Sequence, residues 1–500
     1  MLTRKRFLVA LAVLLAFAAI GARALWDPDE GRYTNVALHM LESGDWIHPM
    51  RSDEVAHWTK PPLTYWAIAA SVGVFGYEPW AARLPGALAF LATTWLTFRI
   101  ARRLVPGGER SAAIIFATMA LPLIAAHWVS TDFLLTAVVT LALWGFVEAR
   151  WGPPGTSRRA WVFVMWLGFA LAFMTKGPPG LLYLPVLLLF LVAAPGENLP
   201  VRRVFWPPAV FAFLALGLTW YVVVLIQTPG LWDYFVGSEV VDRIAGSGFG
   251  RNSEWYGWLK VYLPVLVIGT LPWTGRMWRA TRRLGADVPR WLRSPEARRA
   301  EDRRWFLWLW VLVPLAVFCV AHSRLPLYLL PLFPALAILA AAAGPLVLAD
   351  GRRHWLWLGA WVAVMIALRL AWAAWPTDKD AGRWADAIRE RAPGAVTEVV
   401  LVDHPPLYGL HLHLGVNVEV VSIQPQSADP LQSRYDHDLA EELAEDEPGR
   451  VFVTRVRRWD ALVAQAQALG FRMTPLGAPF EERIIAVVEQ PSAEPGAPRL

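Results

Sequence analysis

Cysteine occurs only once in the 500 residues, at Cys319, and charged residues are scarce at 18%. A single cysteine excludes an internal disulfide and any metal site built from several thiolates. Hydrophobic residues instead make up 56% of the chain, with 29 tryptophans and a mean hydropathy of +0.38. This is more apolar surface than a soluble domain of this length can bury in one core. The bilayer is therefore predicted to be a main solvent of the chain.

Lysine is also scarce, with five lysines among 47 basic residues. The strong preference for arginine over lysine is typical of a bacterial gene with GC-rich codons, and it gives no indication of a nucleic-acid partner. Two of the lysines, Lys60 and Lys176, stand in similar settings, each after a threonine and close before two prolines. The net positive charge of the chain is not spread evenly. Residues 377–500 hold 20 acidic against 12 basic side chains and so form an acidic tail. This acidic tail is predicted to be a segment of a different kind.

Apolar runs long enough to cross about 30 Å of hydrocarbon recur along the first three quarters of the chain. Eleven such spans are expected, with 13 as the upper limit: 7–25, 81–101, 111–128, 131–149, 160–175, 178–194, 204–226, 258–275, 305–321, 326–348 and 354–375. Every second loop is rich in arginine, which marks these loops as cytoplasmic. The opposite side is then extracytoplasmic and consists of 26–80, 127–131, 176–178, 227–257, 322–325 and the tail.

The start of the chain has a second interpretation. A basic beginning, an apolar stretch and Ala22-Arg23-Ala24 also fit a cleaved signal peptide. Residues from Asp27 onward lie outside the membrane in either case. The localisation expected is thus a multi-pass protein of a bacterial inner membrane, with its polar loops and C-terminus in the periplasm.

Two segments outside the spans carry recognisable patterns. The loop 26–80 is predicted to contain an amphipathic helix after Asp29 and a second, membrane-surface segment from Pro62 to Phe75. The tail alternates helical stretches (379–391, 437–446, 458–469) with β-rich runs (396–402, 416–423, 451–453, 484–488). We therefore expect a mainly α membrane domain at 1–376 and a small α/β domain at 377–500.

Carboxylates gather at the outer membrane boundary. Asp29 and Glu30, followed by Arg32 and Tyr33, come directly after the first span, and Asp132 interrupts an apolar hairpin on the same side. Ionisable groups at this depth are costly unless they have a function, although Asp29 and Asp132 could each simply cap a helix. If they face one cavity, they could orient an acceptor, act as a general base or hold a divalent cation.

Cations are expected at the same boundary. Lys60 and Lys176 precede prolines that fix the backbone, although a lone lysine can also extend to the interface for solvation alone. The other candidates are Arg83, Arg324 with Tyr328, and Glu239 with Arg243, of which the last two are four residues apart and could form only a local helical ion pair. Fixed cations beside carboxylates suit transfer from a phosphate-linked donor, because they stabilise the charge on the leaving phosphate.

In this order, the motifs resemble those of the lipid A aminoarabinose transferases, which belong with the protein O-mannosyltransferases to the GT-C class of membrane glycosyltransferases. The resemblance is carried by Asp29-Glu30-Gly31-Arg32-Tyr33, by the segment from Met40 to Trp46, by Thr59-Lys60-Pro61-Pro62 with Leu63 to Trp66, and by Ala82-Arg83-Leu84-Pro85. It continues more weakly through Asp132, Met174 to Gly177, Pro272-Trp273 and Ser323 to Pro331, and so covers about 350 residues.

The resemblance implies an inverting transferase that uses an undecaprenyl-phosphate-linked sugar as donor and lipid A or another lipid or glycan as acceptor. It also implies that Asp29 and Asp132 are the carboxylates of the site, while Lys60, Arg32 and Tyr328 bind the carrier phosphate and its surroundings. Two departures matter: Thr59 replaces an acidic residue common in the family, and 248–258 contains no histidine. A metal site built from those two groups is therefore not expected here.

Two other functional classes stay open at this point. A transporter or flippase of carrier-linked sugars would place charges at the membrane midplane in broken helices, whereas here the charges gather at one boundary. A membrane-anchored binding protein would instead carry its function in the acidic tail.

Overall fold

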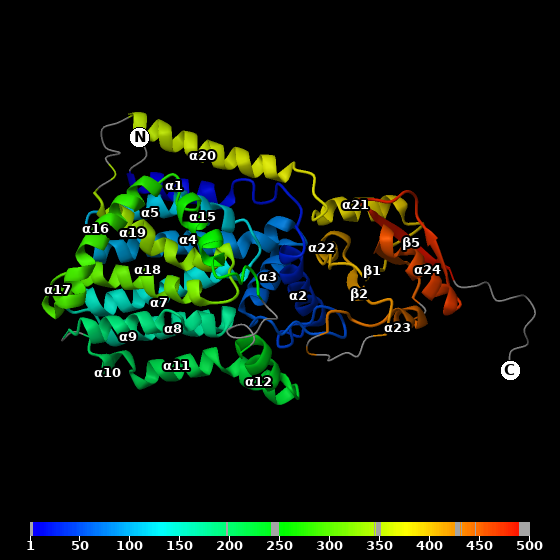
Figure 1. The fold of residues 1–500 in the computed structure, drawn as a ribbon, viewed down its shortest axis with the longest axis horizontal. Helices are drawn as coiled ribbons and strands as arrows, with labels where there is room; N and C mark the ends of the chain where they lie inside the picture. Colours follow the sequence, from blue (N-terminus) through cyan, green and yellow to red (C-terminus); the bar gives the residue numbers. More distant parts are fainter. Residues whose placement is uncertain are drawn as a thin grey trace, which may run out of the picture. The chain divides into compact units, whose positions relative to one another are not determined.

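The computed structural model describes residues 4–196, 199–241, 250–344, 346, 352–425, 431, 433–445 and 447–489. The chain divides into two compact units, each made of several segments that can be followed by their sequence colour in Figure 1. The first unit comprises Met1–Ile20, Thr59–Thr64 and Arg83–Trp372. The second comprises Gly21–Trp58, Tyr65–Ala82 and Ala373–Leu500. Most of the first loop therefore packs with the C-terminal segment, whereas the boundary expected near residue 376 stays a prediction.

Six helices among the described residues are long and apolar enough to cross a membrane, which makes the chain a multi-pass membrane protein. They are α4 (Pro79–Leu104), α7 (Thr131–Trp151), α8 (Arg158–Lys176), α11 with α12 (Pro207–Gly217 and Thr219–Gln227), α18 (Asp302–Val320) and α20 (Arg352–Ala373). All six fall on runs expected from the sequence.

The other five expected spans appear as shorter or interrupted helices. They contain α1 (Arg4–Phe17), α5 (Glu109–Thr118) with α6 (Ala120–Ala125), η1 (Pro178–Leu181) with α9 (Leu184–Ala193), α15 (Gly257–Ile268), and η3 (Pro326–Leu332) with α19 (Phe333–Ala342). The run 111–128 breaks at Met119, which is extended. The amides of Ala120 and Leu121 bond to carbonyls of residues 271 and 269 instead of continuing α5. The total of eleven spans stays a prediction.

The first unit also contains the 20-residue, arginine-rich helix α16 (Thr274–Arg293) and four short elements: α10 (Val201–Val204), α13 (Leu231–Asp233), η2 (Tyr234–Val241) and α17 (Pro295–Ala300). Helices α7 and α8 form its tightest antiparallel pair. A Cβ on Gly145 would lie 2.5 Å from the Met165 nitrogen, and one on Gly168 would lie 2.5 Å from the Ala142 nitrogen. Only glycine allows such close backbone approach, so these two residues fix the register of the pair.

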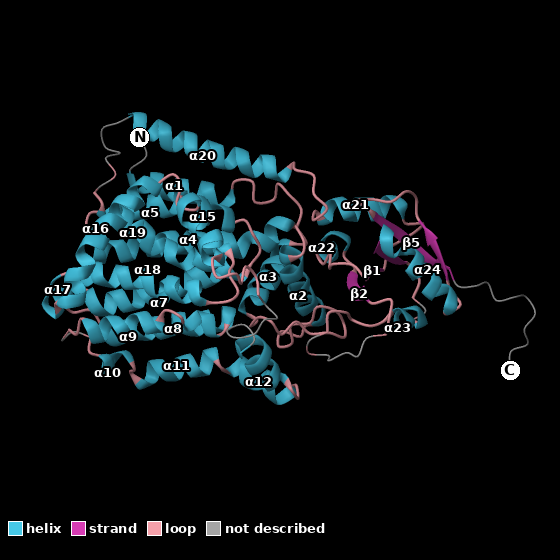
Figure 2. Cartoon of the chain, viewed as in Figure 1, coloured by secondary structure: helices cyan, strands magenta, loops and turns pink. Residues whose placement is uncertain are grey.

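The second unit contains α2 (Asp29–Ser43) and most of α3 (Leu63–Phe75), the two helices expected in the first loop. It also contains the only named strands in the described part of the chain, which Figure 2 shows in magenta. They are β1 (Glu398–Val402), β2 (Asn417–Val421), β3 (Arg450–Arg455), β4 (Arg472–Pro475) and β5 (Arg483–Glu489). The sheet order is β2-β1-β3-β5-β4, with β1 to β3 parallel and β4 and β5 antiparallel.

Helices cover both faces of this sheet. One face packs against α21 (Ala381–Arg391) and α22 (Gly409–Leu414), and the other against α23 (Leu439–Ala444) and α24 (Trp459–Ala468). Both faces being covered explains why β1 is buried along its whole length. The small α/β fold predicted for the tail is thus confirmed, while α22 and β4 are additions to it.

Candidate functional site

Asp132 and Lys176 form an ion pair at one end of the α7–α8 hairpin. Helix α7 is capped by Ser130, whose hydroxyl accepts the Asp132 amide, so the alternative that Asp132 is the cap is wrong. Asp132 lies in the first turn, where the positive end of the helix dipole favours a carboxylate. The antiparallel register set by the two glycines brings the last residue of α8, Lys176, opposite to it.

Tyr328 completes this cluster from η3. The Lys176 ammonium lies 4.7 Å from the centre of the Tyr328 ring, in a cation–π contact. The Asp132 and Lys176 side chains are only 13% and 11% exposed, so their charges interact across little water. The structure thus brings together three residues that the sequence placed at one boundary, although their roles stay predictions.

The acidic motif of the first loop, which begins at Asp29, lies in the second unit. Asp29 is the first residue of α2 and pairs with Arg32 at 2.8 Å, with the Asp29 side chain 54% exposed. Pro28 occupies the cap position and makes no side-chain hydrogen bond there, so the alternative that Asp29 is a cap is wrong. The predicted convergence of Asp29 with Asp132 stays a prediction.

Glu30 and Tyr33 have different surroundings from Asp29. Glu30 is fully buried, pairs with Arg23 and accepts the Trp26 amide at 3.0 Å. These contacts hold the turn that leads into α2, and the catalytic role predicted for Glu30 stays a prediction. The ring of Tyr33 lies 6.0 Å from that of Tyr65.

The remaining predicted cations of the first unit each donate to backbone oxygens. Lys60 donates to its neighbour's carbonyl, Thr59 O, at 2.7 Å, and the buried Arg83 donates to Ile20 O at 3.1 Å. Arg324 is 5% exposed and donates to three carbonyls, those of Asn252, Glu254 and Cys319, at 2.7 to 3.1 Å. This clamp ties the segment 252–254 to the loop that follows α18.

Two predicted residues cannot be placed in the site. Glu239 belongs to η2, but its side chain lies outside the described part of the chain. Arg243 lies outside the described residues altogether. The predicted Glu239–Arg243 pair therefore stays a prediction.

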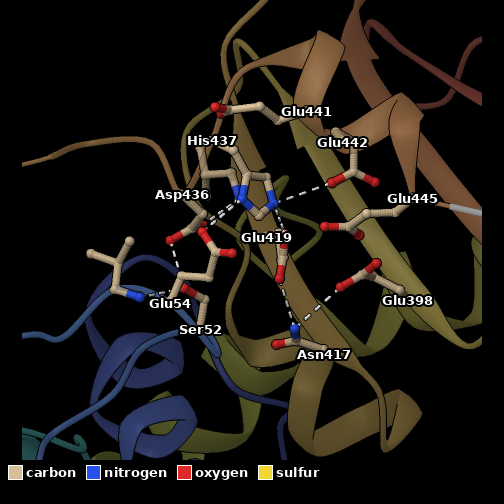
Figure 3. A network of polar contacts seen from close by, with 12 residues as sticks. Ser52, Glu54, Glu398, Asn417, Glu419, Asp436, His437, Glu441, Glu442 and Glu445 are labelled. Atoms are coloured by element: carbon tan, nitrogen blue, oxygen red, sulfur yellow. Dashed lines mark hydrogen bonds and ion pairs between the residues drawn. The ribbon is translucent and has the colours of Figure 1, made fainter. Parts of the chain in front are cut away.

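Sequence reasoning missed a buried polar cluster in the second unit, drawn in Figure 3. His437, just before α23, contacts Glu419 of β2 at 2.5 Å, Glu442 of α23 at 3.4 Å and Glu54 of the first loop at 3.1 Å. The close contacts with the carboxyl groups of Glu419 and Glu442 raise the pKa of His437 to about 12. Burial, then the neighbouring Glu419 and Glu442, raises the pKa of Glu398 to about 8.

The signal for this cluster was the acidic excess of the tail. Its members were not recognisable as a group because they come from separate elements: Glu398 begins β1, Glu419 lies in β2 and Glu442 in α23. Parallel pairing places Glu398 opposite Asn417 and leaves Glu419 two residues along on the same face. Only the sheet brings them together.

Comparison with known proteins agrees with this architecture. The family model for dolichyl-phosphate-mannose-protein mannosyltransferase matches residues 59–225. The crystal structure of ArnT from Cupriavidus metallidurans bound to undecaprenyl phosphate superposes with a TM-score of 0.75 at 22% identity, covering 99% of each chain. The chain belongs to the superfamily of ArnT and the protein O-mannosyltransferases. Its fold is the GT-C fold expected from the sequence.

Two curated relatives give the same result in sequence. The undecaprenyl phosphate-alpha-4-amino-4-deoxy-L-arabinose arabinosyl transferase of Photorhabdus laumondii is 28% identical over 72% of this chain, and the second such enzyme of Pseudomonas fluorescens is 31% identical over 69%. The match spans 63% and 60% of the length of these relatives, respectively. The family resemblance inferred from the motifs is thus confirmed.

Proposed function

We propose that this chain transfers a sugar, with inversion, from an undecaprenyl- or other polyprenyl-phosphate-linked donor to lipid A or another lipid or glycan. The reaction takes place at the periplasmic face of a bacterial inner membrane. The observation that carries the proposal is the partly buried Asp132–Lys176 pair, with Lys176 over the Tyr328 ring. The aminoarabinose transferases named above, and the ArnT structure bound to undecaprenyl phosphate, support the choice of donor.

Lys176 is the residue that this arrangement prepares for a phosphate. Its ammonium is a compact charge on a flexible stem, so it can exchange one anionic partner for another. Without donor, the Asp132 carboxylate neutralises it. A carrier phosphate reaching Lys176 would compete for the same charge and release the carboxylate. Donor binding would thereby make Asp132 available for the acceptor.

The transfer step then follows from charge. The acceptor oxygen attacks the anomeric carbon from the side opposite the carrier, the bond from that carbon to the phosphate oxygen breaks, and polyprenyl phosphate leaves with the electron pair. Lys176, together with Lys60 and Arg32, stabilises the growing negative charge on that phosphate. With a hydroxyl acceptor, Asp132 or Asp29 takes the proton. With an ionised phosphate acceptor, the same carboxylates only orient it.

The orientation of the protein is part of the proposal. Arginines gather in alternate loops, and the positive-inside rule places those loops in the cytoplasm. The start of α7, the end of α8 and the whole acidic tail then face the periplasm. Polyprenyl-linked sugars on the outer leaflet could reach this side directly.

The proposal is tested with the full chain in lipid nanodiscs, supplied with undecaprenyl-phosphate-linked aminoarabinose and lipid A, with mass spectrometry of the lipid A. A mass increase by one sugar is expected in the wild type, and Asp29→Asn should abolish it while leaving the protein folded. Other polyprenyl-phosphate sugars and glycan acceptors are run in parallel. If no pair of donor and acceptor yields product, the proposed activity is wrong.

The phosphate contact of Lys60 has a matched control in Lys260, a lysine that is 58% exposed and pairs loosely with Glu254 at 3.7 Å. Lys60→Ala should weaken donor binding about tenfold, a loss of about 1.4 kcal/mol. Lys260→Ala should bind donor like the wild type. Equal donor affinity in the two variants would remove Lys60 from the donor site.

A further inference from the structure

The polar cluster around His437 is unusual in its balance of charge. Glu419, Glu442 and Glu398 are all buried, at 5%, 0% and 6% exposure. The basic side chains that contact them are His437 and Arg450. Three acidic side chains therefore lie beside two basic ones in a region with little water, where burying an uncompensated charge is costly.

Three ligand atoms converge at the centre of this cluster, as Figure 3 shows. His437 Nε2, an oxygen of Glu419 and an oxygen of Glu442 all lie within 4.8 Å of one another. The Glu442 Oε1 atom accepts a hydrogen bond from Arg450 at 2.7 Å. Its Oε2 atom is buried and has no hydrogen-bond partner among the residues that the structure describes, and it lies 3.4 Å from His437 Nε2. A fully buried carboxylate oxygen thus faces the ring nitrogen at a separation longer than that of the His437–Glu419 contact.

That separation agrees with coordination geometry. Tetrahedral bonds of about 2.0–2.1 Å to nitrogen and oxygen place neighbouring ligand atoms about 3.3–3.4 Å apart. Glu419 is closer to His437, at 2.5 Å, and would have to move outward by less than 1 Å to match. The contact between His437 and Glu442 already has the required length.

The outer contacts of the three residues are those of an oriented ligand set. His437 Nδ1 lies 3.1 Å from Glu54, and a carboxylate on the second ring nitrogen commonly fixes a metal-binding imidazole. Asn417 donates to Glu419 Oε1 at 3.0 Å and to Glu398 at 3.1 Å, which leaves Glu419 Oε2 directed at His437. With Nδ1 donating to Glu54, the Nε2 lone pair of a neutral ring would face two carboxylates, which requires a cation between them.

We propose that Glu419, His437 and Glu442 bind one divalent transition-metal cation of the Zn²⁺ type, with Glu54 and Asn417 orienting the ligands. Two carboxylates and one imidazole suit such an ion and would leave one position for water. Because Glu54 belongs to the segment 21–58 and the ligands to the C-terminal part, the ion joins the first loop to the sheet inside the second unit. The ion is independent of the sugar-transfer proposal.

A proton could satisfy part of the same geometry. An imidazolium would donate from Nδ1 to Glu54 and from Nε2 to Glu419. It would leave Glu442 Oε2 without a hydrogen bond and would add only one positive charge. The two alternatives differ in one measurable property, which is whether the chelator-treated protein takes up zinc.

The test uses the full chain in detergent after treatment with a chelator, titrated with Zn²⁺ and followed by calorimetry, metal analysis and thermal unfolding. One equivalent should bind with a dissociation constant of about 1 µM or below and raise the unfolding midpoint. Glu442→Gln and His437→Gln should lose that equivalent. The matched control is Glu441→Gln on the same helix, which should retain it, since Figure 3 shows Glu441 directed away from His437.

Two results would overturn the proposal. One is a chelator-treated wild type that binds no zinc, which is what the imidazolium alternative predicts. The other is unchanged zinc binding by Glu442→Gln, which would locate the ion elsewhere. Because the wild-type titration requires no variant to fold, it decides alone. Glu54→Gln, which removes only an orienting contact, should weaken binding about tenfold.

Discussion

The two ends of helix α7 carry buried charge in different ways. At its end, Glu148 accepts Arg103 at 2.9 Å and Trp144 at 3.3 Å, and Arg150 contacts Asp302 at 3.3 Å. At its beginning, Asp132 pairs with a lysine that also covers a tyrosine ring. The first arrangement uses the rigid fork of arginine, and the second uses a mobile point charge.

This difference separates a structural ion pair from one that a ligand can open. Arg150 contacts the Asp302 carboxylate, the Ala194 carbonyl and the Trp151 ring. It would lose all of these contacts if it moved, so a ligand is not expected to open this ion pair. Lysine can turn toward a phosphate and keep a favourable contact throughout. Both ends of α7 carry an ion pair of opposite charges. What distinguishes the structural pair from the one that a ligand can open is whether the cation is arginine or lysine.

The largest expected effect comes from Asp132→Asn. It removes the carboxylate that balances Lys176, and turnover should fall by about 10²–10⁴-fold if Asp132 is a base. Asp302→Asn is the matched control, because it breaks a partly buried pair with Arg150 in the same unit. It should lower stability and leave turnover per folded molecule within about threefold. Equal loss of turnover in both variants would show that the two ends do not differ as argued.

Gly168→Ala tests the register that creates the pair. A methyl group there would lie 2.5 Å from the Ala142 nitrogen, which is backbone and cannot yield cheaply. We expect a loss of about 1–3 kcal/mol in unfolding free energy, together with lower activity, because α7 and α8 must separate. Thermal unfolding in detergent and the transfer assay measure both. Wild-type stability would mean that the hairpin is looser than the structure has it.

Arg324→Lys tests whether Arg324 stabilises the fold or binds substrate. Lysine cannot reach the three carbonyls that Arg324 bonds, so stability should fall by about 2 kcal/mol. The KM for donor should not change if the residue is structural. A raised KM with an unchanged unfolding midpoint would instead support the substrate-binding role predicted from the sequence.

The smallest effect is expected from pH in the second unit. Burial lowers the pKa of His404 from 6.5 to about 4, with Arg483 and Arg455 opposing its charge and Asp378 favouring it. Because the unfolded chain binds this proton more readily, stability is full above pH 6.5 and falls as the pH drops toward 4. Between pH 6.5 and 5.5 the loss should be about 1 kcal/mol.

His404→Gln provides the control for this titration. Glutamine can accept from Arg483, as His404 Nε2 does at 3.1 Å, but it does not titrate in this range. The decline in unfolding midpoint between pH 6.5 and 5.5 should be shallower in this variant. An identical decline would assign the pH dependence to other groups.

The sequence by itself determined the membrane class, the positions of the long apolar helices and the α/β character of the tail, because each depends on local hydrophobic periodicity. Ordered motifs also identified the superfamily. Which charged side chains contact one another was decided only by the tertiary structure. Lys176 reaches Asp132 because glycines set a helix register, and Glu419 reaches His437 because two strands pair in parallel. Arg324 was predicted from the sequence as a cation of the same site as Lys176, yet it donates to backbone carbonyls, since the contacts of a cation depend on the partners that folding supplies.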